Sequence, residues 1–205
     1  MLKPMPLKEA ITTYLHSVKA LCPKVGEAEW NYLERGLTVV ERNARDFFIH
    51  AGTVQQEIGF VCSGLLRAFY VDNNGDEISV KFIGEGNYAT DYSSFITQTP
   101  CKYSFQCIER SVMVTLRYQH IQEGYERFPN LERYGRLMAE KVLKIQQARI
   151  ESFLFENAEA RYLQFIQAHP DLFNRVSLSY LASYLGIERQ SLTRIRQKLA
   201  RPKAF

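Results

Sequence analysis

The chain has 205 residues, a formal net charge of +4 and a hydrophobic content of 46%. This apolar content is sufficient for a buried core and excludes an intrinsically disordered chain. No apolar run reaches the length of a membrane span, and prolines and a glutamate interrupt the first ten residues, where a signal peptide requires an apolar run. We therefore expect a cytoplasmic protein with no membrane partner, large enough for a core domain and a small second domain.

The cysteines and histidines do not have the spacing of a metal or catalytic site. The sequence contains no Cys-x-x-Cys, Gly-x-Ser-x-Gly, His-Glu-x-x-His or P-loop motif. The segment 84–89 matches Gly-x-Gly-x-x-Ala, but the residues after it leave no room for the crossover helix of a dinucleotide-binding fold, so a β-turn is favoured. We predict no enzyme activity, no metal and no cofactor. Four buried free thiols are expected, with a redox sensor or iron–sulfur ligand set as the alternative: Cys22, Cys62, Cys101 and Cys107.

The first half of the chain changes from helical to β-rich patterning. Apolar residues recur at helical spacing over 7–21 and 27–39, which predicts two helices that pack as a cap. Between two of the β-rich segments, Asn74 and Gly75 predict a tight hairpin, because both residues tolerate a positive φ. The predicted β-rich segments are 46–50, 57–62, 65–71, 77–83 and 103–116.

The second half begins with an unusually long predicted helix, which Asn130 caps and which runs to about Asn157. We predict that an apolar stripe on this helix pairs with the same stripe of a second copy in a symmetric homodimer. The reason is that Leu137 and Leu143 provide a second face, which is available for packing within the chain. The alternative is that the same apolar stripe packs on the chain's own β-rich domain. The stripe has the spacing of a coiled-coil seam: Leu131, Tyr134, Met138, Val142 and Ile145.

The last segment of the sequence has the pattern of a helix-turn-helix. A short helix is predicted over 158–168, ended by Pro170, and Ser177 is placed to cap the first helix of the motif. Gly186 stands where the chain must turn, and it can adopt a positive φ at little steric cost. Six apolar residues supply the contacts between the two helices: Leu181, Ala182, Leu185, Ile187, Leu192 and Ile195.

The second helix of this motif is strongly basic. No Asp or Glu occurs between Arg189 and Lys203. The charge of this stretch is therefore more positive than the net charge of the whole chain, which is +4. A membrane-surface helix would also be basic, but the few apolar residues here are committed to packing in the motif. Nucleic acid is therefore the predicted partner of the six cations: Arg189, Arg194, Arg196, Lys198, Arg201 and Lys203.

Taken together, these motifs resemble the Crp/Fnr family of bacterial transcription regulators over nearly the whole chain. The segments Cys62–Gly75 and Gly84–Ala89 are similar to consecutive turns of the family's cyclic-nucleotide-binding-type β-roll, and Leu181–Ile195 is similar to its DNA-binding motif. The resemblance implies an α+β fold with an N-terminal helical cap, a β-roll, a long dimerisation helix and a C-terminal helix-turn-helix. The implied boundaries are 1–128 for the sensor domain, 129–157 for the dimerisation helix and 158–205 for the DNA-binding domain.

The resemblance also implies roles for the basic helix. Arg189, Gln190 and Arg194 would face base edges in the major groove, where Arg matches guanine and Gln matches adenine in bidentate fashion. Glu188 stands where the family often has Ser or Thr, and the sequence lacks residues for the family's wing hairpin, so specificity is expected to depend on the helix. The predicted DNA-binding residues are Ser177, Arg189, Gln190, Ser191, Thr193, Arg194 and Lys198.

The implied ligand site departs from the family pattern. Cyclic-nucleotide-binding members have a Gly-Glu-Leu turn and an Arg-Ser pair around the phosphate, whereas this chain has Thr90 in the turn and Lys102-Tyr103 at the pair. The guanidinium fork is lost and Tyr103 is bulky, so we expect that cyclic AMP and cyclic GMP are not effectors. The candidate ligand pocket, with an unidentified effector or partner, comprises Thr90, Asp91, Tyr92, Ser93, Lys102 and Tyr103.

The predicted function is that of a dimeric, sequence-specific transcription regulator of the Crp/Fnr type. Its implied partners are double-stranded DNA with an inverted repeat, a second copy of the chain, RNA polymerase and a small-molecule effector. The alternative is a ligand-sensing or protein-interaction module whose helix-turn-helix does not bind DNA.

Overall fold

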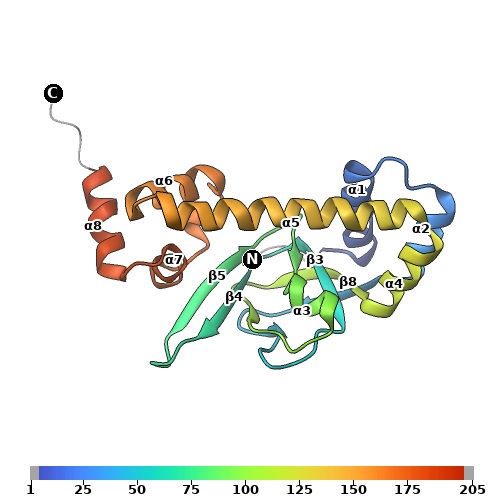
Figure 1. The fold of residues 1–205 in the computed structure, drawn as a ribbon, viewed down its shortest axis with the longest axis horizontal. Helices are drawn as coiled ribbons and strands as arrows, with labels where there is room; N and C mark the ends of the chain where they lie inside the picture. The colour runs from blue at the N-terminus through green and yellow to red at the C-terminus, as the bar shows by residue number, and fades with distance from the viewer. Residues whose placement is uncertain (1–4, 201–205) are drawn as a thin grey trace. The chain divides into compact units, whose positions relative to one another are not determined.

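The computed structural model describes residues 5–200, which form helices and two antiparallel sheets (Figure 1). The chain divides into two compact units. Within the described residues, the first unit contains 5–68 together with Phe82–Lys144, and the second contains Phe69–Lys81 together with 145–200.

The first unit begins with two helices, as the helical spacing predicts. Helix α1 spans Leu7–Leu21 and buries Ala10, Tyr14 and Val18, which are four residues apart and therefore share one face. Helix α2, Glu27–Gly36, is shorter than predicted. The residues expected to extend it form strand β1 instead, because the β-branched run at Thr38–Arg42 pairs with a strand from the far end of the roll.

The β-roll of the first unit consists of two antiparallel layers. One sheet has the order β1-β8-β3-β6 and the other has the order β2-β7-β4-β5. In the first sheet Phe60 pairs with Val114, and both side chains are buried against α1 in the core. The predicted run at 103–116 is two strands rather than one. Beyond β1, the strands are β2 (Phe47–Ile49), β3 (Glu57–Ser63), β4 (Leu66–Val71), β5 (Glu77–Ile83), β6 (Tyr88–Ala89), β7 (Ser104–Cys107) and β8 (Ser111–Arg117).

The predicted hairpin forms between β4 and β5. Asp72 organises the turn, because its Oδ1 accepts the backbone N–H groups of Asn74 at 2.8 Å and Asp76 at 2.9 Å. Gly75 has a φ of +87°, whereas Asn74 does not take a positive φ, so the turn is longer than a two-residue hairpin turn. The outer part of this hairpin belongs to the second unit.

Within the roll, the short helix α3 (Tyr92–Thr97) lies between β6 and β7. Two longer helices follow the last strand of the roll. Helix α4 spans Tyr118–Arg127, and α5 spans Pro129–Phe155. Because α5 begins at Pro129, Asn130 does not cap it; its amide donates a hydrogen bond to Glu29 Oε1 at 2.9 Å instead.

The second unit contains the last part of α5 and the C-terminal helices. Asn157, which we predicted near the end of the long helix, caps α6 (Ala158–Ala168) by accepting the backbone N–H of Ala160 at 2.9 Å. Ser177 caps α7 (Leu178–Leu185) as predicted, since its Oγ accepts the N–H of Tyr180 at 3.2 Å. Helix α8 spans Arg189–Ala200, and a 3₁₀ turn lies at Leu172–Asn174.

Candidate functional site

The helix-turn-helix of α7 and α8 has a compact apolar interior. Gly186 ends α7 with a φ of +69°, the left-handed conformation that the sequence predicted there. A Cβ at this position would also lie 2.8 Å from the ring of Phe153, so glycine is required both by the turn and by its neighbour. The residues that bury the contact between the two helices are Leu181, Ala182, Leu185 and Leu192.

Two arginines outside the motif hold the C-terminal end of α7. Arg161 donates to the backbone carbonyl of Leu185 from Nε at 3.2 Å and Nη2 at 3.0 Å. Arg149 donates to the carbonyl of Tyr184, and its guanidinium stacks 3.7 Å from the centre of the Tyr184 ring. Because the last carbonyls of a helix lack partners within the helix, these cations stabilise α7 at its negative end. Sequence analysis did not identify this role.

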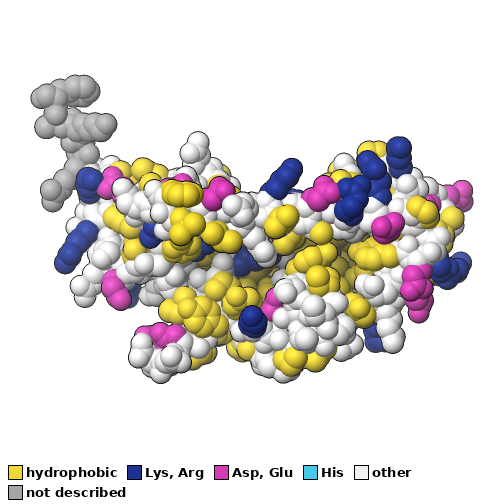
Figure 2. Space-filling model, viewed as in Figure 1, with side chains coloured by type: hydrophobic (Ala, Val, Ile, Leu, Met, Phe, Trp, Pro, Cys, Tyr) yellow, Lys and Arg dark blue, Asp and Glu magenta, His cyan; other side chains and the backbone are white. Residues whose placement is uncertain are grey.

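The predicted base-reading residues lie together on one exposed face of α8. Arg189, Gln190 and Arg194 are all exposed, as is the further predicted DNA-binding residue Thr193, and the spacing of the four places them within one face of a helix. Lys and Arg side chains project from α8 in the space-filling view (Figure 2). Gln197 is also exposed one turn beyond Thr193, so it extends the same face and was missed by the sequence analysis. We call this surface, comprising Arg189, Gln190, Thr193, Arg194 and Gln197, the recognition face.

Three of the other predicted DNA-binding residues make contacts within the chain: Ser177, Arg196 and Lys198. Ser191 is half-buried, and Ser177 uses its hydroxyl to cap α7. Lys198 lies 2.7 Å from Glu159 of α6 in an exposed ion pair. Arg196 stacks 4.9 Å from the ring centre of Phe173, while Arg201 and Lys203 lie outside the described residues.

The six residues of the predicted ligand pocket do not all line one cavity in the structure. The carboxylate of Asp91 accepts hydrogen bonds from the Ser94 hydroxyl at 2.8 Å and from the backbone N–H of Lys102 at 3.2 Å, so it holds α3 in place. The side chains of Ser93 and Lys102 are exposed. Thr90 and Tyr92 line the cavity that is described in the next paragraph, whereas Tyr103 does not.

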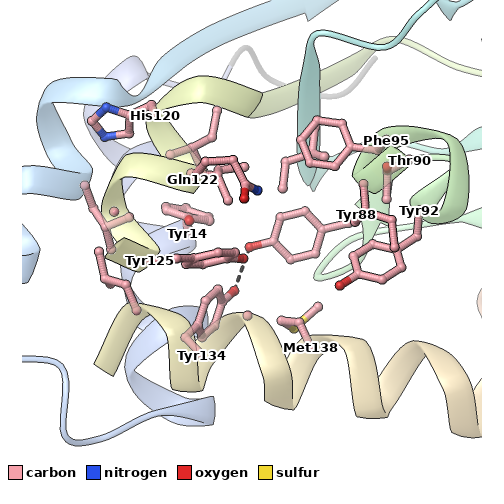
Figure 3. Close-up of a pocket in the computed structure, with 18 of the residues that line it drawn as sticks. Tyr14, Tyr88, Thr90, Tyr92, Phe95, His120, Gln122, Tyr125, Tyr134 and Met138 are labelled. Carbon is pink, nitrogen blue, oxygen red and sulfur yellow. Dashed lines mark hydrogen bonds between the residues drawn. The ribbon is translucent and has the colours of Figure 1, made fainter. Parts of the chain in front are cut away.

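A cavity of about 90 Å³ lies in the first unit between the roll and its helices. Figure 2 shows this face hollowed beneath the N-terminal part of α5, with hydrophobic side chains around the hollow. Figure 3 shows tyrosines from α1, β6, α3, α4 and α5 pointing toward the cavity. We call it the aromatic pocket, after its six tyrosines: Tyr14, Tyr32, Tyr88, Tyr92, Tyr125 and Tyr134.

The hydroxyls of this pocket differ in their partners. Tyr88 and Tyr134 share a hydrogen bond of 2.6 Å (Figure 3). Burial raises the pKa of Tyr134 to about 12 and also raises the pKa of Tyr125 well above its usual value. These phenols are therefore neutral at physiological pH. Gly135 makes room for Tyr125, because a Cβ there would lie 2.3 Å from the Tyr125 hydroxyl.

The predicted dimerisation stripe of α5 does not face outward along its whole length. Leu131 and Tyr134 are 3% and 8% exposed and belong to the core of the first unit, so the alternative interpretation, packing within the chain, holds for them. Met138 and Val142 line the aromatic pocket. Ile145 is exposed, and so are five large apolar residues of α5 that the stripe did not include: Leu143, Ile150, Phe153, Leu154 and Phe155.

Neither a metal site nor a membrane span is found among residues 5–200. No group of three or more His, Cys, Asp or Glu side chains in this range is arranged to hold a metal ion. The four cysteines are buried free thiols, as predicted. No helix of the described chain combines the length and the apolar character needed to cross a membrane.

Comparisons with known proteins agree with this architecture. Residues 39–128 match the family model of the cyclic nucleotide-binding domain. The c-di-GMP responsive global regulator CLP of Xanthomonas campestris has a similar structure at 15% identity, with 86% of this chain and 96% of that chain covered and a TM-score of 0.67. FixK2 from Bradyrhizobium japonicum is similar at 12% identity, with coverages of 80% and 84% and a TM-score of 0.71.

A third structure, the Thermus thermophilus Catabolite Activator Protein, is similar at 18% identity, with coverages of 88% and 86% and a TM-score of 0.55. No curated protein sequence matches the chain significantly. The chain therefore has the fold of Crp/Fnr-type regulators, with a domain of the cyclic-nucleotide-binding type, as the resemblance implied.

Proposed function

We propose that this protein is a dimeric transcription regulator that binds DNA sequence-specifically through the recognition face of α8. The observation that carries this proposal is the set of exposed Arg and Gln side chains on one face of the second helix of a helix-turn-helix. A helix of this kind fits the major groove, and the guanidinium of Arg194 can donate two hydrogen bonds to O6 and N7 of guanine. Gln190 can make the equivalent pair of bonds to adenine.

The other cations supply binding that does not depend on sequence. Lys198 is exposed and pairs with the half-buried carboxylate of Glu159, and ion pairs at the surface contribute little to stability. A DNA phosphate can therefore replace Glu159 as its partner at small cost. Ser191 and Thr193 lie in the first turns of α8, where hydroxyls and the helix dipole favour phosphate.

We further propose that the functional unit is a symmetric homodimer formed through the exposed apolar residues of α5. Leu143, Ile150 and Leu154 are separated by seven and four residues, which places them along one side of the helix. Exposed leucines and isoleucines in this number are unfavourable in water and favour a partner helix. A two-fold dimer would present two recognition faces to an inverted repeat with half-sites about 34 Å apart.

The experiment that tests DNA binding starts from selection of bound sequences out of a random duplex library, followed by mobility shifts on the selected site. Arg194→Ala is expected to cost about 1–3 kcal/mol on this site and to relax the base preference at one position. Lys198→Ala is expected to weaken binding to all sequences alike and to lower the salt slope by about one unit.

Lys141→Ala, which removes an exposed cation of α5, is the matched control and is expected to leave binding unchanged. If no sequence is enriched and the protein does not bind duplex DNA at low salt, the proposal is wrong and the chain is a sensing module without DNA-binding function. If Arg194→Ala leaves affinity and base preference unchanged, Arg194 does not read bases.

A further inference from the structure

The aromatic pocket has an uncharged lining. None of its lining residues is a Lys, Arg, Asp or Glu. The ring of His120 is turned away from the centre of the pocket, because it stacks on Tyr32 at 4.2 Å and its Nε2 lies 3.1 Å from the Tyr32 carbonyl (Figure 3). A ligand that enters this pocket therefore meets no side chain able to neutralise a charge.

An ionic ligand would bind poorly in such a place. An anion moved from water into an apolar cavity loses hydration energy that only a cation or several aligned N–H donors can replace. Lys102, the basic residue of the predicted ligand pocket, has an exposed side chain and does not line the cavity. The pocket thus selects against phosphates and carboxylates.

Two hydroxyls of the pocket are available to a ligand. Within the part of the chain that the structure describes, Tyr92 and Tyr125 make no hydrogen bond through their hydroxyls, in contrast to Tyr88 and Tyr134. Both hydroxyls point toward the space between α3, α4 and α5 (Figure 3). Tyr92 and Tyr125 are half-buried, so a ligand in the pocket can reach both hydroxyls, and a bound molecule with one polar group would give them a partner.

The rest of the lining fits a flat ring. Tyr88, Phe95 and Tyr125 offer aromatic faces and edges, which attract another ring in stacked or edge-on arrangements. Met138 adds a flexible thioether, which adapts to the shape of a ligand and interacts favourably with aromatic rings. The cavity of about 90 Å³ has room for a single small ring.

We propose that the aromatic pocket binds a neutral molecule with one aromatic ring that carries a single hydroxyl or carbonyl group. The ring packs among the tyrosines and Met138, and the polar group exchanges hydrogen bonds with Tyr92 and Tyr125. This proposal concerns binding to the first unit and does not depend on whether α8 binds DNA.

The test is calorimetric titration of the full chain, without DNA, using phenol as the probe, toluene as the same ring without a polar group and benzoate as the same ring with a charge. Phenol is expected to bind one site per chain with a dissociation constant below about 1 mM, and benzoate at least about tenfold more weakly. Tyr125→Phe is expected to weaken phenol binding about five- to tenfold and to leave toluene binding unchanged, because only phenol loses a hydrogen bond.

A second pair of variants tests the location. Met138→Trp fills the cavity and is expected to abolish phenol binding, whereas Met138→Leu, which nearly preserves the volume, is expected to retain it. Circular dichroism and thermal unfolding establish that each variant is folded. The proposal is overturned if phenol shows no saturable binding, if benzoate binds as tightly as phenol, or if folded Met138→Trp binds phenol like the wild type.

Discussion

Single residues in this protein are constrained most strongly where the backbone takes an unusual conformation next to a neighbour. Gly186 and Gly75 both have a positive φ, at +69° and +87°. They differ in their surroundings, because a Cβ at Gly186 would approach Phe153 whereas a Cβ at Gly75 would meet nothing within 4 Å. This difference separates the cost of the backbone conformation from the cost of a steric clash.

Gly186→Ala is therefore expected to destabilise the protein more than Gly75→Ala. Each substitution places a Cβ in the left-handed region, which costs about 1 kcal/mol. Gly186→Ala must in addition displace the Phe153 ring, which makes its total cost about 2–3 kcal/mol. Urea unfolding of the two variants measures the difference, and equal losses would show that Phe153 moves aside freely.

The thiol of Cys62 illustrates how burial controls reactivity. Its Sγ lies 3.4 Å from the carbonyl of Ala10, and burial raises its pKa to about 11. The thiolate, which is the reactive form, then accounts for about 0.1% of Cys62 at pH 8. Burial also raises the pKa values of Cys101 and Cys107.

We accordingly expect slow labelling of Cys62, Cys101 and Cys107 by iodoacetamide in the native protein at pH 8, and rapid labelling in urea. Mass spectrometry of tryptic peptides at successive times gives the rate for each residue. Labelling of any one of them as fast in the native as in the unfolded protein would support the alternative of a redox-sensing cysteine.

At the scale of elements, α7 is positioned as much by its neighbours as by its own sequence. Arg161 of α6 also donates to the carbonyl of Glu156 at 2.6 Å, so one guanidinium joins the end of α5, the start of α6 and the end of α7. Ser183 on α7 adds a contact with the β4–β5 hairpin, because its Oγ accepts the backbone N–H of Ser79 at 3.2 Å. These contacts orient α7, and through α7 they orient α8.

Arg161→Ala is expected to lower the free energy of unfolding of the second unit by about 2 kcal/mol, because it leaves helix-terminal carbonyls without charged donors. Arg189→Ala removes an exposed arginine of the recognition face and is expected to change stability by less than about 0.5 kcal/mol. Hydrogen exchange of the backbone amides of residues 178–200 measures the change in stability in each variant. Equal protection in the two variants would mean that Arg161 does not stabilise the motif.

At the scale of the whole molecule, the proposed dimer depends on which side of α5 remains exposed. Leu131 and Tyr134 pack within the first unit, whereas Leu143 and Ile150 are 66% and 55% exposed. The interface proposed from the structure is therefore displaced toward the C-terminal end of the helix, relative to the interface predicted from the sequence.

Replacing Leu143 and Ile150 together by Glu is expected to convert the dimer to monomers and to weaken binding to an inverted repeat strongly, because it places charges in an apolar contact between copies. Sedimentation velocity measures the mass of the species. Lys141→Glu, an exposed charge change on the same helix, is the control and should remain dimeric. A Leu143–Ile150 double variant that stays dimeric would place the interface elsewhere.

The amino-acid sequence by itself determined the features of this protein that depend on local patterning. The period of apolar residues identified α1, α6, α7 and α8, and the turn chemistry of Gly186 and Ser177 located the helix-turn-helix, because these signals act over one or two turns of chain. The concentration of cations in α8 likewise needed no tertiary information. Strand β1 was missed, since its pairing with β8 comes from residues about seventy positions away.

Only the tertiary structure decided how each surface is used. The stripe of α5 has the same spacing whether it faces a partner or the chain's own core, and the packing of α1 and the roll against Leu131 and Tyr134 selected the core. The six tyrosines of the aromatic pocket come from six elements spread over 120 residues, so no local pattern joins them. Spacing along a helix specifies which side chains share a face, whereas long-range packing specifies what that face contacts.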